Sequence, residues 1–145
     1  MSANPYPPEI LDEDDDNGTM PENVEALAEA VIGHRIVAVE KKETSSRRYG
    51  IGDTQLILTL DNGTRVELVD SKDCCAYTEL KAFLLHPDKV DHIITGVGTT
   101  DEYETWHIFA DMGDVLELSV AWSSGNPFYY SYGFQINVVP VEDAA

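Results

Sequence analysis

The chain has 145 residues, of which 43% are hydrophobic and 25% are charged, as expected for one globular domain. All nine Lys and Arg residues lie in residues 35–89, whereas Asp and Glu are spread evenly, with nine in each of residues 1–34, 35–89 and 90–145. The net charge of −18 is therefore carried by the two flanks, which favours basic protein surfaces or cations and opposes nucleic acid or an anionic membrane.

The cellular location follows from what the sequence lacks. No apolar run approaches the roughly 18–20 residues that span a bilayer. The first residues also lack the basic and apolar regions of a secretory signal. We therefore expect a cytoplasmic protein.

The N-terminal residues 1–18 predict a flexible acidic arm, because they combine three prolines with few apolar groups to offset the entropy of ordering. A single folded domain is expected over residues 19–140, followed by a short tail over residues 141–145. The acidic side chains at the centre of the arm are Asp12, Glu13, Asp14, Asp15 and Asp16.

A helix is predicted over residues 20–32. Thr19 and Glu22 have the spacing of a capping box, and Gly33 is a typical C-terminal stop. Apolar residues recur with helical period on one face, at Val24, Leu27, Ala28 and Val31.

From residue 35 the apolar period changes to two, which predicts strands over residues 35–42, 54–60 and 64–69. Asn62 and Gly63 between the last two indicate a tight hairpin. Asp73 is a candidate N-cap for a second helix over residues 74–85, with Tyr77, Leu80 and Leu84 packed inward and Phe83 as a further candidate.

The C-terminal half predicts strands over residues 92–99, 103–110, 114–122 and 128–139. Gly96 and Gly98 in the first of these indicate a bulge or a close backbone approach. The predicted fold class is α+β, with about seven mostly antiparallel strands in hairpins and two helices packed on the sheet.

Candidate chemical groups are scattered along the sequence. Cys74 and Cys75 are adjacent and predict free structural thiols, although a metal-binding or nucleophilic role for them stays open. The four histidines lie in separate segments, and Glu104 and His107 fall on opposite faces of a strand, so we expect surface or hydrogen-bonded histidines rather than ligands. No catalytic or cofactor motif is present, and we expect no cofactor, no metal and no enzymatic activity.

The stretch LILTLDNGTRVELVDSKDCCAYTEL, residues 56–80, together with the aromatic-rich strands after it, resembles a group of small uncharacterised proteins encoded by actinobacterial phages. The resemblance covers residues 34–138 and implies no known activity. It implies a phage protein that acts in a bacterial cytoplasm.

The leading functional hypothesis is a non-enzymatic interaction protein that binds a basic surface of a host or viral protein, with DNA mimicry as a special case. A virion or assembly component that forms homo-oligomers is the alternative. A small metal-binding protein or enzyme that uses Cys74, Cys75 and nearby acids is a third. The expected partner-binding residues are the five acids of the arm together with Asp101, Glu102, Glu104 and Tyr129.

Overall fold

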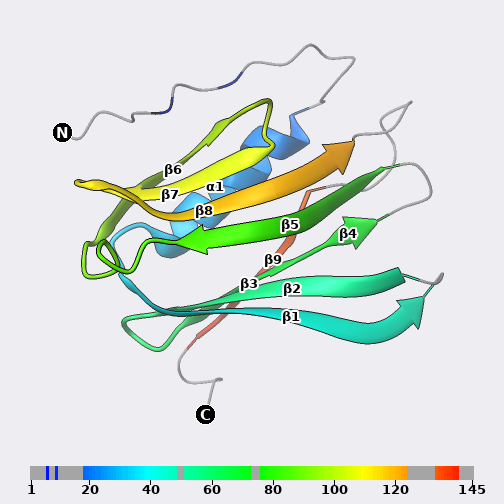
Figure 1. Cartoon of the computed structure of the whole chain (residues 1–145), viewed down its shortest axis with the longest axis horizontal. Coiled ribbons are helices and arrows are strands. Elements are labelled where there is room, and N and C mark those ends of the chain that lie inside the picture. Colours follow the sequence, from blue (N-terminus) through cyan, green and yellow to red (C-terminus); the bar gives the residue numbers. More distant parts are fainter. Residues whose placement is uncertain are drawn as a thin grey trace.

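The computed structural model of the chain describes residues 6, 9, 18–48, 51–72, 76–123 and 133–140. Within these residues the chain forms one helix and nine antiparallel strands in two sheets (Figure 1). The first sheet has the strand order β1-β2-β3-β9, and the second has the order β4-β5-β8-β7-β6. The element bounds are α1 (Thr19–Val31), β1 (Ile36–Arg48), β2 (Ile51–Leu60), β3 (Arg65–Val69), β4 (Ser71–Lys72), β5 (Tyr77–Leu85), β6 (Ile94–Thr100), β7 (Thr105–Ala110), β8 (Gly113–Ser123) and β9 (Gln135–Val139).

The first predicted hairpin is confirmed in β2 and β3. Leu56 pairs with Leu68 across the two strands, and Leu58 pairs with Val66. All four of these residues are buried. The tight turn is possible because Gly63 adopts a φ of 87°, which glycine reaches without a steric penalty. The Asn62 side chain accepts the Thr64 amide at 3.0 Å and closes the turn.

The predicted first helix is also confirmed, with one difference at its start. Gly18 occupies the N-cap position and no side chain caps the helix, so the predicted capping box of Thr19 and Glu22 does not form. The helix packs against β6 of the second sheet and β9 of the first, and so joins the two sheets at their edges. Asn23 fixes it to the chain before β9, because its amide group donates to the Phe134 carbonyl and accepts the Phe134 amide, each at 2.9 Å.

The predicted second helix is wrong, and with it the α+β fold class: the described chain is mostly β, with a single helix. Residues 77–85 form strand β5, which pairs with β8. The register shifts between Leu80 and Ala82, so Leu80 and Phe83 both pack toward the core although they are three residues apart. A spacing of three residues between inward-facing side chains is also typical of a helix. Leu84, which the predicted helix would pack against the core, is 56% exposed.

The predicted C-terminal strands are largely confirmed as β6, β7 and β8. The strand expected over residues 128–139 is described only from residue 133, and β9 forms its last five residues. The two sheets and α1 share one hydrophobic core, in which Trp106 is fully buried and meets Phe134 edge to face at 5.3 Å. No described helix is long and apolar enough to cross a membrane.

Candidate functional site

The second sheet has an outer face that points away from the hydrophobic core and is nevertheless partly buried. On β7, Trp106 and Ile108 point into the core, and the alternation of the strand places His107 between them on the outer face. His107 pairs in register with Glu117 on β8, so their side chains are neighbours on this face. His107 is only 7% exposed.

A β-bulge adds a second carboxylate to the same face. Ile108 pairs with Leu116 but Phe109 pairs with Asp114, which leaves Val115 as the extra residue on β8. Val115 and Leu116 are both fully buried. The extra residue therefore turns Asp114 toward the face of Glu117, although two residues three positions apart would lie on opposite faces of a regular strand.

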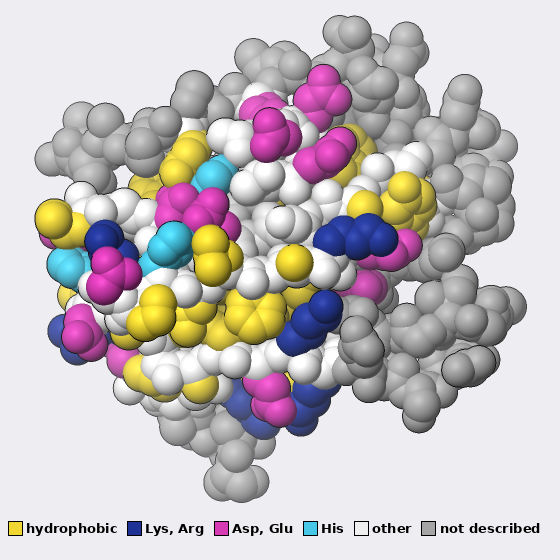
Figure 2. Space-filling view, in the orientation of Figure 1, with side chains coloured by type: hydrophobic (Ala, Val, Ile, Leu, Met, Phe, Trp, Pro, Cys, Tyr) yellow, Lys and Arg dark blue, Asp and Glu magenta, His cyan; other side chains and the backbone are white. Residues whose placement is uncertain are grey.

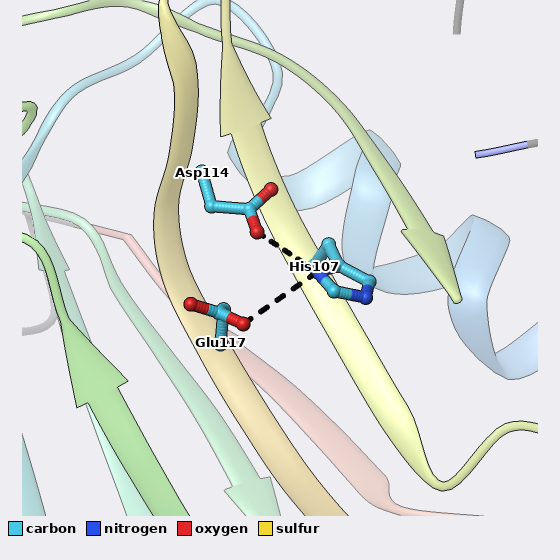
Figure 3. A group of neighbouring side chains, drawn as sticks. All are labelled: His107, Asp114 and Glu117. Atoms are coloured by element: carbon cyan, nitrogen blue, oxygen red, sulfur yellow. Dashed lines mark hydrogen bonds and ion pairs between the residues drawn. The ribbon is translucent and has the colours of Figure 1, made fainter. Parts of the chain in front are cut away.

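His107 lies beside these two carboxylates (Figure 3), and a hydroxyl group lies at its other ring nitrogen. Its Nδ1 atom is 2.9 Å from Asp114 Oδ2 and 3.9 Å from Glu117 Oε1. Its Nε2 atom is 2.8 Å from Thr100 Oγ1 on the neighbouring strand β6. Both ring nitrogens are thus engaged, and the ring orientation is fixed.

Two further residues extend this network. His86, just after β5, places its Nε2 atom 2.6 Å from Glu117 Oε2, so Glu117 bridges two imidazoles. The Tyr6 hydroxyl donates to Asp114 Oδ1 at 2.6 Å, and its ring stacks on His107 with 3.9 Å between the ring centres. We call His86, His107, Asp114, Glu117 and Tyr6 the outer-face cluster.

Gly98 makes room for the Tyr6 ring. A Cβ atom at Gly98 would overlap Tyr6 Cβ, and one at Gly96 would come within 2.6 Å of the Phe109 ring. The expected close approach at these glycines is therefore confirmed. Burial raises the pKa of Tyr6 far above its ordinary value, and the hydrogen bond to Asp114 raises it further, so the hydroxyl stays protonated and donates.

The turn between β6 and β7 carries three of the predicted partner-binding acids. Asp101, Glu102 and Glu104 are all exposed. Asp101, Glu102 and Tyr103 adopt left-handed φ values of 58°, 56° and 64°, a conformation that non-glycine residues rarely take. The successive amides of Glu102 and Tyr103 donate to the carboxylate of Glu9, at 2.6 and 3.2 Å.

Side chains from elsewhere hold this turn in place. The indole of Trp106 donates to the Tyr103 carbonyl at 2.9 Å, and that of Trp122 donates to the Glu102 carbonyl at 2.8 Å. Glu9 and Tyr6 both belong to the segment predicted as a flexible arm. The mobility of residues 1–18 stays a prediction, although these two described residues of the arm contact the second sheet.

The remaining histidines agree with the expectation of hydrogen bonding. His34 Nδ1 lies 3.1 Å from Asp61 Oδ1, and His92 Nδ1 lies 3.1 Å from Asp111 Oδ1. These two pairs are more exposed than the His107–Asp114 pair. The other predicted site residues lie outside the described residues: Asp12, Glu13, Asp14, Asp15, Asp16, Cys74, Cys75 and Tyr129.

The sequence does not predict the outer-face cluster, because the four histidines lie in separate segments. One signal was present: in the hairpin predicted over residues 103–110 and 114–122, His107 lies between the apolar Trp106 and Ile108, and Glu117 lies between Leu116 and Leu118, which places both polar residues on the outer face. The bulge that brings in Asp114 and the contact of Tyr6 had no comparable signal, since Tyr6 and Asp114 are 108 positions apart.

The fold and the site together define a two-sheet β domain with one packed helix and a carboxylate–histidine cluster on the outer face of its second sheet. Residues 29–136 match the model of a family described as a domain of unknown function, DUF7448, and the chain belongs to this family. No curated protein and no solved structure matches the chain.

Proposed function

We propose that this protein is a non-enzymatic interaction protein that binds a basic surface of another protein through its acidic side. The observation that carries the proposal is that the two acid-only flanks of the sequence pack together. The helix α1 comes from the first flank, and it contacts β6 and β9, which come from the second. The charges of two distant segments are thereby concentrated on one side of the molecule.

Some of the exposed carboxylates of both flanks lie toward one end. The Gly33 amide donates to the Ile94 carbonyl at 2.9 Å, which fixes the end of α1 beside the start of β6. The helix runs back along β6, so its first turn lies toward the β6–β7 turn (Figure 1). In Figure 2, acidic side chains gather at the top of the view, where Figure 1 places this turn. The exposed acids of the two elements are Glu22, Asp101, Glu102 and Glu104 at this end, and Glu25 and Glu29 further along α1.

These acids are not neutralised within the part of the chain that the structure describes. No described lysine or arginine forms an ion pair with any of the six. The basic residues whose side chains the structure describes lie in or near the first sheet, on β5 and in the loop after β5: Arg35, Lys41, Lys42, Arg65, Lys81 and Lys89. A basic partner would therefore meet uncompensated charge at this end.

The partner we propose is a host or viral protein in a bacterial cytoplasm, because the sequence resembles phage-encoded proteins. A DNA-binding protein is a special case, in which carboxylates would occupy the positions of phosphates. Asp12, Glu13, Asp14, Asp15 and Asp16 would add to the field, and Tyr129 to the contact, as the sequence predicts.

The test is capture of a partner from host lysate by the immobilised chain, at about 50 mM and about 500 mM salt, which shortens the Debye length from roughly 14 to roughly 4 Å. We expect capture to fall at high salt and in an E102Q/E104Q variant. An E40Q/D91N variant is the matched control, because it removes two exposed charges elsewhere. Capture that is independent of salt, or that falls equally in both variants, would contradict the proposal.

Homo-oligomerisation through a strand edge is the second candidate. Strand β1 forms an edge of the first sheet and spans 13 residues, and Val37 on it is 63% exposed. Unpaired edges of this kind can pair between copies. Size-exclusion chromatography distinguishes the two functions, since an assembling component elutes as an oligomer and the proposed binding protein as a monomer.

A further inference from the structure

We propose that His107, Asp114 and Glu117 bind a divalent metal ion of the zinc class on the outer face of the second sheet. Each offers one donor atom, and these three atoms all lie within 4.8 Å of one another. Imidazole nitrogen and carboxylate oxygen are ligands that Zn²⁺ takes in proteins. The inference is independent of the acidic interaction surface, which lies on other residues.

The distances between the donors suit such an ion. Ligands about 2.0–2.2 Å from a tetrahedral zinc lie about 3.3–3.6 Å from one another. The two measured separations from His107 Nδ1, 2.9 Å to Asp114 and 3.9 Å to Glu117, bracket this value. Small side-chain rotations would therefore bring all three atoms to coordination distance, and three protein ligands would leave a fourth position for water.

Charge supports the same conclusion. Asp114 and Glu117 are 15% and 30% exposed, and two carboxylates that approach one imidazole at a partly buried site repel each other. Among the described residues, the ion-pair partners of these carboxylates are histidines and never lysine or arginine. A divalent cation would neutralise both carboxylates, which a neutral imidazole cannot do.

The surrounding hydrogen bonds are those that metal ligands need. For Nδ1 to coordinate, the ring proton of neutral His107 must lie on Nε2, where Thr100 Oγ1 can accept it at 2.8 Å. Tyr6 donates to Asp114 Oδ1 and leaves Oδ2 directed at His107. His86 similarly holds Glu117 Oε2 and leaves Oε1 on the His107 side. Tyr6 and His86 are thus positioning residues.

The His92–Asp111 pair is a natural comparison within the same chain. It also joins a histidine Nδ1 to a carboxylate, at 3.1 Å, and it too lies beside β6 and β7. It lacks a third donor, however. Among the described residues, three potential metal ligands lie close enough to share one ion only at His107, Asp114 and Glu117. A D111N variant therefore removes a similar contact without touching the proposed site.

The experiment uses the full chain, stripped with a chelator and titrated with Zn²⁺ by calorimetry and with Co²⁺ by visible absorption. We expect one ion per chain, and we expect D114N and E117Q each to weaken binding at least tenfold. Y6F, which keeps the stacked ring but loses the hydroxyl, should weaken it about 10–100-fold. D111N and the C74S/C75S double variant should bind as the wild type does.

Circular dichroism of each variant separates loss of the site from loss of the fold, and E117Q, the more exposed substitution, is the second variant should D114N unfold. The proposal is overturned if the stripped protein takes up no stoichiometric Zn²⁺ or Co²⁺. It is also overturned if folded E117Q and D114N bind as tightly as the wild type, or if only C74S/C75S abolishes binding.

Discussion

Replacing Trp106 with Phe should lower the free energy of unfolding by about 2–4 kcal/mol. Trp106 is fully buried, and its indole N–H is the donor to the Tyr103 carbonyl at 2.9 Å. A buried acceptor that loses its donor costs about 1–3 kcal/mol, and the smaller ring leaves a cavity that costs about 1 kcal/mol more. The edge-to-face contact with Phe134 survives in the variant, so it adds little to the loss.

W122F is the matched control, because the same substitution removes the same kind of bond from the same turn. Trp122 donates to the Glu102 carbonyl at 2.8 Å and meets Tyr103 edge to face. That bond is exposed, however, so water can replace the lost donor. We expect W122F to lose only about 0.5–1 kcal/mol.

Urea denaturation followed by circular dichroism measures both losses, with an unchanged m-value as the condition for comparing midpoints. The chain has two tryptophans, so each variant leaves a single indole whose fluorescence reports its own environment. Equal losses in W106F and W122F would refute the reasoning, because burial would then not determine the value of these indole bonds.

Three further predictions concern the N-terminal contacts and one exposed ion pair. G98A should displace Tyr6, because a Cβ at this position overlaps Tyr6 Cβ, and limited proteolysis should then cleave the N-terminal segment faster; an unchanged cleavage rate would argue against the contact. E9A removes the acceptor of two amide hydrogen bonds and should cost about 1 kcal/mol in urea denaturation, whereas E22A, on the exposed face of α1, should cost almost nothing. The pKa of Asp61 is lowered below its ordinary value of 3.8, chiefly by the hydrogen bond with His34. Ionised Asp61 therefore stabilises the fold above pH 3.8, and this stabilisation is lost as the pH falls through the lowered pKa. The difference in Tm between wild type and D61N should therefore vanish in acid, and a difference that is constant from neutral pH to strong acid would contradict this.

The sequence allowed the locally determined parts of the fold to be predicted. The helix α1 follows from apolar residues at helical spacing, and the β2–β3 hairpin from strict alternation around Asn62 and Gly63. Strand β5 was misread because its bulge near Leu80 gives inward-facing residues a helical spacing. A bulge places two residues of one strand opposite one residue of its partner strand. Its position therefore depends on the pairing of two strands, which the local pattern of one strand does not specify.

The candidate site likewise has one part that could be predicted from the local sequence and one part that could not. The placement of His107 and Glu117 on one face follows from a hairpin that the sequence predicts, and the exposure of the acids in the β6–β7 turn was expected. Asp114 reaches the site only through a second bulge, and Tyr6 only through a contact with a distant segment. Both belong to tertiary structure, which overrides the local pattern.

The left-handed turn between β6 and β7 also bears on the order in which the chain folds. Three consecutive residues in this conformation cost roughly 1–2 kcal/mol each. The contacts that offset this penalty include ones from Trp122, 20 positions from Glu102, and from Glu9, 93 positions from it. The β6–β7 turn therefore does not nucleate its own hairpin, whereas the Asn62–Gly63 turn can. We expect the pairing of β2 with β3 to precede the pairing of β6 with β7 in the folding transition state. In the native protein the same difference should make the amides of the β6–β7 turn open to hydrogen exchange well before those that join β2 to β3.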